Sequence, residues 1–366
     1  MTTPPHDPLP IAQVPVGELL GRELEARDWS QADFAAVLDR PTQFVSEIVT
    51  GKKEITRESA AQIGAALGHT AEYWLNLQDQ YLLAEQFKNE NAQVKLDEVR
   101  RRARLNDKGP IQLLKRRGFL TGATLDALEA EVKELFELDS LDDEPGFAAA
   151  ARRANRSEDI SSLQRAWVAC IRREARKLPP QERYCAKRLR ELAGTLSRTL
   201  KSAADFEDLP DLFSAVGVRL VYVESLPGAK IDGCSMLVDG YPVIGLSGRG
   251  KRLDKILFTL LHEIAHILLD HVDAEHLIVE GLDEDQGNET KWEKDADTEA
   301  AEWVFPHGIP DVPDRIGARW VNQLAVELDV ARIVIVGHLQ HRGHLDWRTT
   351  LAKNAPSVND ALASWD

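Results

Sequence analysis

The pentapeptide His262-Glu263-Ile264-Ala265-His266 constrains this chain more than any other feature of its sequence. Apolar residues flank it in 256–261 and 267–269, which is the pattern of a buried helix. Residues four apart lie on one face of a helix, so both imidazoles can hold one metal ion. Glu263 is close enough to take a proton from a water at that metal. We therefore expect His262 and His266 to be metal ligands and Glu263 to be the catalytic base.

A second helix, expected downstream, offers the third ligand. Residues 293–305 place Ala, Trp, Val and Phe at helical spacing and stop at Pro306. Glu293 and Asp297 lie one turn apart on one face of this helix. We expect Glu293 to bind the metal and Asp297 to accept the second N–H of a ligating histidine. The alternative is that both are solvated acids on a surface helix. If Glu293 proves not to be the third ligand, Asp297 or His271 is the next candidate.

The donor set decides which ion to expect. Two imidazoles and one carboxylate are borderline ligands that suit zinc, and manganese is the other ion that this set accepts. We expect one Zn²⁺ per chain, with water completing the site.

Length and cysteine usage narrow the class of protein. The 366 residues suffice for two or three domains, each with its own core. No apolar run of about 18 residues occurs and the first residues lack the pattern of a signal peptide, so we expect no membrane span. Three widely spaced cysteines, an odd number, indicate a reducing cytoplasm.

Charge is unevenly distributed along the chain, whose formal net charge is −15. Residues 270–302 contain 13 acidic and 2 basic residues, whereas residues 149–203 contain 14 basic and 5 acidic ones. This asymmetry indicates two regions that have different partners or that face each other. A solvated acidic loop and a solvated basic helix face are the alternative.

The N-terminal part has the plan of a helix-turn-helix. Ser30 is a good N-cap for a helix over 31–38, a turn follows at 39–41, and a second helix over 42–49 ends at Gly51. Small and amide side chains at the start of that second helix are typical of a recognition helix. We expect two sets of DNA contacts, to base edges from Thr42, Gln43 and Ser46 and to phosphates from Gln31, Lys52 and Lys53.

The charge of this part opposes that assignment. Residues 1–80 carry 12 acidic and 6 basic residues, which is a poor balance for a DNA-binding surface. A helical protein-binding module is therefore an alternative. Dimerisation would focus the few bases on one face, and we expect a homodimer.

Longer segments resemble two known families. Residues 17–20, 29–31, 46–56 and 65–78 are similar to the XRE-type domain of HigA-family antitoxins, and residues 217–223, 245–247, 258–269 and 293–306 resemble the ImmA/IrrE family of metallopeptidases. Together these resemblances cover most of the chain. They imply that the two histidines and Glu293 hold the metal, that Glu263 is the base, and that the substrate is a protein such as a transcriptional repressor. The chain departs from the family pattern at Glu299, where Phe is frequent, and at Asp270, where His is frequent and His271 is displaced by one.

The expected fold is α+β and mostly helical. Strands are predicted over 219–223, 235–238 and 242–246, the last two joined by a turn at Asp239-Gly240. The predicted domains are a helix-turn-helix bundle over 1–83, a helical connecting region over 84–209, and a zincin-like metallopeptidase domain with a small sheet and a helical C-terminal extension over 210–366.

Two functional hypotheses follow. The first is a transcription regulator that binds duplex DNA at an operator, its own promoter, and carries a zinc-dependent endopeptidase that cleaves a protein in a stress- or toxin–antitoxin-linked response. The second is a DNA-binding antitoxin or autorepressor that uses the peptidase-like half for sensing or toxin binding without proteolysis. A protein-interaction scaffold is a third reading. Glu263 favours the first hypothesis, because a module that only binds has no need of a base there.

Overall fold

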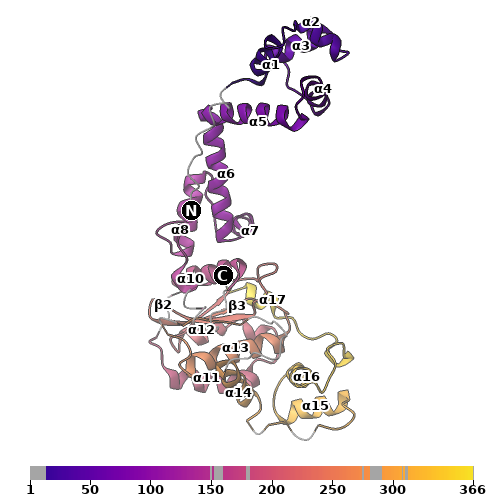
Figure 1. The fold of residues 1–366 in the computed structure, drawn as a ribbon. Helices are drawn as coiled ribbons and strands as arrows, with labels where there is room; N and C mark the ends of the chain where they lie inside the picture. The colour runs from indigo at the N-terminus through magenta and orange to yellow at the C-terminus, as the bar shows by residue number, and fades with distance from the viewer. Residues whose placement is uncertain are drawn as a thin grey trace. The chain divides into compact units, whose positions relative to one another are not determined.

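The computed structural model describes residues 14–148, 151, 160–178, 182–273, 276–280, 291–306, 308–309 and 312–365. The chain divides into two compact units, Met1–Arg101 and Arg102–Asp366, whose elements are labelled in Figure 1. Within the described ranges, no helix is both long and apolar enough to cross a membrane.

The smaller unit is built from short helices around one apolar core. These helices are α1 (Val16–Glu25), α2 (Gln31–Val37), α3 (Thr42–Val49), α4 (Arg57–Leu67), α5 (Ala71–Lys88) and the first part of α6 (Glu90–Lys108). Phe34 of α2 and Val45 of α3 share this core with the fully buried Trp74 of α5. The helix-turn-helix pair is therefore packed against the rest of the unit through its apolar face.

Local signals in the sequence determine the ends of α2 and α3. The Ser30 side chain accepts a hydrogen bond from the Asp33 backbone N–H, while the Asp33 carboxylate accepts one from the Ser30 N–H, so a capping box begins α2. Gly51 follows α3 with φ +70°, a left-handed conformation that favours glycine. Both predictions for this pair of helices are confirmed.

The larger unit contains a four-stranded sheet in the order β1-β3-β2-β4. Its strands are β1 (Arg219–Tyr222), β2 (Gly233–Val238), β3 (Tyr241–Leu246) and β4 (Ile278–Glu280). β1 is parallel to β3, and the other pairs are antiparallel. Asp239 and Gly240 join β2 to β3 with φ of 53° and 82°, as a type I′ hairpin turn requires. The three predicted strands are confirmed, whereas β4 has only three residues and was not predicted.

Helices cover both faces of this sheet. Successive side chains of each strand point to opposite faces, so the strands contribute apolar side chains to two separate cores. One core contains Val221 and Val243 and is covered by α7 (Ile111–Arg116), α8 (Leu125–Phe136) and α10 (Ser162–Lys177). The other core contains Leu220 and Ile244, and Figure 1 shows α13 on the side of the sheet opposite α10. The helices of this second layer are α11 (Ala186–Thr199), α12 (Leu209–Ser214), α13 (Leu253–Leu268), α14 (Lys291–Val304), α15 (Ala318–Glu327), α16 (Arg332–His341) and α17 (Asn359–Ala363).

The units divide at a different place from the predicted domains. Residue 83 lies inside α5, which continues to Lys88, and the division falls after Arg101. Leu189 and Leu196, predicted within a connecting region, are fully buried in the same core as Leu260 of α13. Most of that region is thus part of the larger unit. The sequence predicted that residues 84–209 are mostly helical, but it could not identify the helix that α11 packs against.

Candidate metal centre and helix-turn-helix surface

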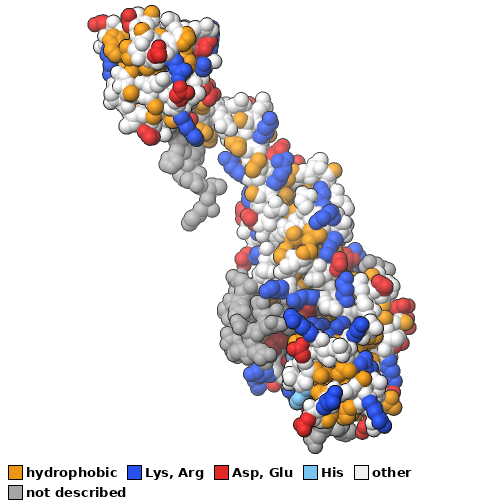
Figure 2. Space-filling model, turned by 90° about the vertical axis from the view of Figure 1, so that its right-hand side faces the viewer, with side chains coloured by type: hydrophobic (Ala, Val, Ile, Leu, Met, Phe, Trp, Pro, Cys, Tyr) orange, Lys and Arg blue, Asp and Glu red, His pale blue; other side chains and the backbone are white. Residues whose placement is uncertain are grey.

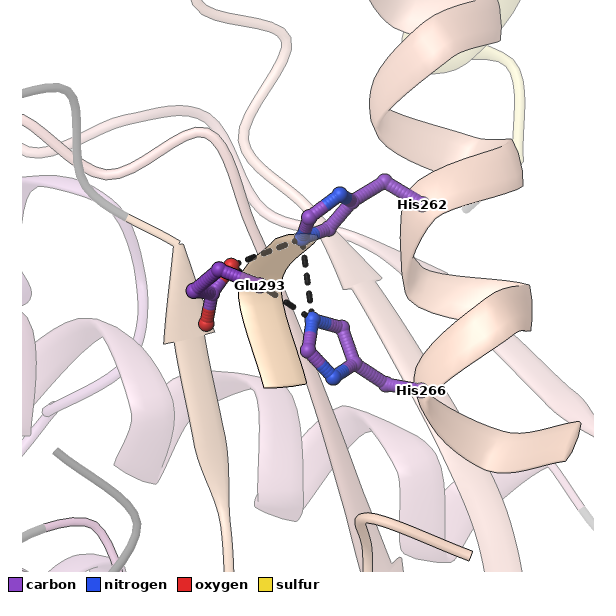
Figure 3. A group of neighbouring side chains, drawn as sticks. All are labelled: His262, His266 and Glu293. Carbon is purple, nitrogen blue, oxygen red and sulfur yellow. Dashed lines mark hydrogen bonds and ion pairs between the residues drawn. The ribbon is translucent and has the colours of Figure 1, made fainter. Parts of the chain in front are cut away.

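Helix α13 carries the histidine pair through the core of the larger unit. Leu257, Leu260 and Ile264 are buried on its apolar sides. The helical repeat brings His262 and His266 to one side, with 3% and 0% of their surface exposed, and Figure 3 shows both rings pointing toward Glu293. Glu293 comes from the first turn of α14, so two helices that are separated in the chain form the cluster.

Three lone-pair atoms converge between these helices. His262 Nε2 lies 2.9 Å from His266 Nε2 and 3.0 Å from Glu293 Oε2. His266 Nε2 lies 3.6 Å from the same carboxylate oxygen. Tetrahedral zinc with bonds of about 2.0–2.2 Å requires ligand atoms roughly 3.4 Å apart, which is close to this spacing. Among the described residues, this is the group of His, Cys, Asp and Glu atoms arranged closely enough to hold a metal ion.

A second residue contacts the outer nitrogen of each histidine. His262 Nδ1 lies 2.8 Å from Asp297 Oδ1, one turn along α14 from Glu293. Because a carboxylate only accepts, His262 Nδ1 donates this hydrogen bond, and Nε2 is the ring nitrogen that faces Glu293 and His266. His266 Nδ1 lies 3.0 Å from His271 Nδ1, and His271 stacks on the Trp292 ring at 5.0 Å. Asp297 therefore has the contact that was expected of it, and His271 contacts a candidate ligand from outside the cluster.

The electrostatics of this cluster suit a cation. Burial would raise the pKa of Glu293, but its hydrogen bonds to His262 and His266 outweigh burial and hold that pKa well below its usual range. Burial lowers the pKa of His266, so the neutral ring with a lone pair is favoured. Burial and then His266 lower the pKa of His271 to about 4. Neutral imidazoles facing a carboxylate are the donors that a divalent cation needs.

The cluster is accessible from the α14 side. The Glu293 and Asp297 side chains are 27% and 39% exposed, whereas those of His262 and His266 are 4% and 0% exposed. A metal ion or a polypeptide can therefore reach the ligand atoms past α14, while the rest of α13 is covered by protein.

Glu263 lies on the side of α13 that faces the sheet. It is fully buried, and the Ser235 hydroxyl of β2 hydrogen-bonds its Oε2. Gly233 of the same strand faces Oε1 so closely that a Cβ there would be 2.5 Å from this oxygen. A side chain at position 233 would thus collide with the carboxylate, which explains why glycine occupies it. Alternation along β2 places both contacts on one face, but the sequence did not indicate either partner.

The six predicted DNA-contacting residues lie at the surface of the smaller unit. Five of them are exposed and Ser46 is half-buried. The Gln43 amide donates a hydrogen bond to Glu47 Oε1 at 2.8 Å, one turn along α3. The Lys53 ammonium lies 4.7 Å from the centre of the Phe44 ring. The Lys53 side chain, which follows α3 in the chain, therefore lies against the first turns of that helix.

The basic residues of this unit differ in whether they form ion pairs. Arg22, Arg27 and Arg40 form ion pairs with acidic residues of the same unit. Lys52 and Arg57 have no acidic partner within the described part of the chain, and they lie between the end of α3 and the first residue of α4. Free cations are thus concentrated beside the predicted recognition helix despite the negative net charge. On the face drawn in Figure 2, Lys and Arg side chains stand beside Asp and Glu on this unit.

The sequence reasoning missed Ser235, the contact between His271 and His266, and Arg57. Only Arg57 had a usable signal, because it follows Lys52 and Lys53 closely in the sequence and comes directly after Thr56, the N-cap of α4. Ser235 and His271 depend on the packing of α13 against other segments, which spacing alone does not reveal.

Comparison with known proteins finds proteins that are similar to the N-terminal part of this chain. No protein-family model matches the chain. The chain is similar to the uncharacterized HTH-type transcriptional regulator YddM of Escherichia coli (strain K12), with 31% identity over 69 residues, which are 19% of this chain and 73% of that protein. Among solved structures, it is similar to an addiction module antidote protein of a HigA (higA) family from Coxiella burnetii, with 33% identity, 23% of this chain and 91% of that chain covered, and a TM-score of 0.22.

Proposed function

This chain belongs to the HTH-type transcriptional regulators through its N-terminal unit, and on that premise we propose that it is a DNA-binding regulator with a zinc-dependent endopeptidase in its larger unit. The peptidase cleaves a protein substrate, a transcriptional repressor, in the cytoplasm. The smaller unit binds duplex DNA at the operator in its own promoter as a homodimer. The larger unit belongs to the zincin-like metallopeptidases of the ImmA/IrrE type.

One observation carries the proposal of a metallopeptidase. His262 Nε2, His266 Nε2 and Glu293 Oε2 converge to within 3.6 Å of one another, and the outer nitrogen of each histidine has a partner of its own. Two imidazole nitrogens and one carboxylate oxygen aimed at the same point are the donor arrangement that a divalent cation needs. Because the cluster is partly exposed on the α14 side, a substrate can reach it there.

Each residue has a defined part in the proposed hydrolysis. A zinc ion held by the two histidines and Glu293 would supply Lewis acidity, which lowers the pKa of a water and polarises a peptide carbonyl. Glu263 accepts the proton of the attacking water and passes it to the leaving amine. Ser235 orients the Glu263 carboxylate through its hydroxyl, and Asp297 holds the His262 ring in the tautomer that offers Nε2 as a ligand.

The helix-turn-helix half of the proposal rests on family membership and on the free cations beside α3. Thr42, Gln43 and Ser46 read base edges, and the phosphates are bound by Gln31, Lys52 and Lys53 with Arg57. A two-fold dimer would double the number of phosphate contacts and match a palindromic operator.

Glu263→Gln tests the enzyme directly. The amide has nearly the size of the carboxylate but cannot accept the proton, so cleavage should fall about 10²- to 10⁴-fold. We would incubate zinc-loaded full-length protein with the regulators encoded beside it and follow the fragments by mass spectrometry. Glu327→Gln, an exposed residue of α15, is the matched control and should cleave like wild type.

Zinc content and DNA affinity should not change in Glu263→Gln, because this residue is not among the ligand atoms. Wild type and Glu263→Gln should also be compared in cells that carry a reporter gene under the control of the proposed operator. If both proteins give the same fragments and the same reporter expression, the alternative is supported, namely an antitoxin or autorepressor that uses this unit for sensing or toxin binding.

A further inference from the structure

A groove between α14 and α16 adjoins the candidate metal centre. Its deeper part is a cavity of about 390 Å³. Asp297 and Thr298 line it from α14, His338 and His341 from α16, and Phe258 from α13. A second cavity of about 350 Å³ shares Thr298 and His338 with the first and continues past the end of α14.

Asp297 connects the groove to the metal centre. Its carboxylate lines the deeper cavity, and its Oδ1 accepts the hydrogen bond from His262 Nδ1. The groove therefore begins one side chain away from a candidate ligand. A peptide lying in it would have its next residues beside the convergent atoms of His262, His266 and Glu293.

The groove presents positive charge in a chain whose formal net charge is −15. Lys294 and Arg342 line the deeper cavity, are exposed, and have no acidic partner within the described residues. Asp297 lines the same cavity and accepts the hydrogen bond from His262, and it forms an ion pair with neither cation. Glu302 lines only the second cavity, so the deeper cavity holds two cations against one carboxylate. Two cations that form no ion pair around one cavity are suited to a further carboxylate, which Arg can bind with two parallel hydrogen bonds.

The wall formed by α16 is held in place before any ligand arrives. A Cβ at Gly337 would lie 2.0 Å from Asp254 Oδ2 of α13, so the two helices touch at this glycine. Arg252 Nη2 donates to Gln340 Oε1 at 2.9 Å and also pairs with Asp254. The rim that carries His341 and Arg342 is thus fixed relative to α13, and little ordering is required on binding.

We propose that this groove binds an acidic segment of the polypeptide substrate and so selects peptide bonds next to Asp or Glu residues. The inference rests on the proposed peptidase function for its biological meaning, but the binding itself does not require catalysis. Lys294 and Arg342 act as specificity-determining residues, and His338 and Phe258 form the floor and wall against which the peptide chain packs.

Peptide binding to the full-length Glu263→Gln protein tests the groove without cleavage of the probe. Fluorescein-labelled hexaglutamate should bind about tenfold or more tightly than labelled hexaglutamine in low salt. Arg342→Ala with Lys294→Ala should remove that difference, and Arg342→Lys should keep part of it. Arg319→Ala, which removes an exposed charge of α15 outside the groove, should bind hexaglutamate like the parent. Equal affinity for the two peptides, or no effect of the double substitution, would refute the groove.

Cleavage of a proteome-derived peptide mixture by the zinc-loaded wild-type chain separates this inference from the peptidase proposal. An enrichment of Asp or Glu at one fixed distance from the cleaved bond, if it disappears in Arg342→Glu, supports both the groove and the peptidase. Cleavage without any acidic preference refutes the groove and leaves the peptidase. Selective hexaglutamate binding with no cleavage of any peptide supports the groove and refutes the peptidase.

Discussion

The two units present their functional side chains in opposite ways. His262 and His266 are buried, and each contacts a further side chain at its outer nitrogen. Thr42 and Gln43 lie on the surface, where the Gln43 amide donates a hydrogen bond to Glu47, its neighbour one turn along the same helix. Metal ligands must be oriented before the ion binds, since a loosely held ligand lowers affinity. Side chains that read DNA are ordered by the DNA itself.

This difference has a consequence for mutation. Around the metal centre, changing a residue that never touches the ion should weaken metal binding, because the ligands depend on their neighbours. On the helix-turn-helix surface, each contact should contribute separately, since within the described residues no hydrogen bond joins any two of the six predicted DNA-contacting side chains.

The largest effect expected from this comparison is at Asp297. Asp297→Ala removes the acceptor of the His262 Nδ1–H, and zinc affinity should fall about 10- to 100-fold. Competition with a fluorescent chelator measures this. Asp295→Ala, two residues away on the same helix and exposed, is the control and should bind zinc like wild type. Equal affinities for the two variants would mean that the ligands are not held by their neighbours.

An effect of similar size, confined to the other unit, is expected at Gly17. A Cβ there would lie 2.2 Å from the Ile48 carbonyl oxygen, so Gly17→Ala should destabilise the smaller unit by about 1–3 kcal/mol. Gly21→Ala, one turn along α1, meets Val49 only at 3.7 Å and should be neutral or stabilising by about 0.5–1 kcal/mol. Hydrogen exchange should speed up in α1–α5 of Gly17→Ala and not in α13. Loss of protection in α13 as well would show that the two units are coupled.

A third set of effects is expected on DNA, and the changes in salt dependence are the smallest among them. Lys52→Ala and Arg57→Ala should each reduce the slope of log affinity against log salt by about one, through loss of a phosphate contact. Gln43→Ala should instead relax sequence preference, by about 1–3 kcal/mol at one base pair. Arg22→Ala, whose guanidinium pairs with Glu18, is the control and should leave the slope unchanged. Fluorescence anisotropy with the DNA upstream of the gene measures all four variants.

The sequence predicted best what depends on short spacing. The histidine pair, the Ser30 cap, the type I′ turn and the separation of Glu293 from Asp297 each lie within a few residues, and the helical or strand repeat converts that spacing into geometry. That α14 would bring Glu293 to the histidines was inferred from residue chemistry, and the structure brings the three together.

What could not be predicted depends on packing between distant segments. Ser235 reaches Glu263 only because β2 crosses α13. The groove exists only because Gly337 lets α16 approach Asp254. Residues 186–206 could be recognised as helical, but their assignment to the larger unit required the shared core with Leu260. The hydrophobic periodicity of the sequence does not reveal any of these contacts.

The zinc content of wild type and Glu293→Ala tests the central claim, that a metal centre joins α13 to α14, most directly. We predict close to one zinc per wild-type chain after dialysis, and an affinity at least about 100-fold lower in Glu293→Ala, because one of three ligands is lost. Glu302→Ala, farther along the same helix, should retain wild-type zinc. A wild-type chain without zinc or manganese, or undiminished metal in Glu293→Ala, would contradict the proposed centre.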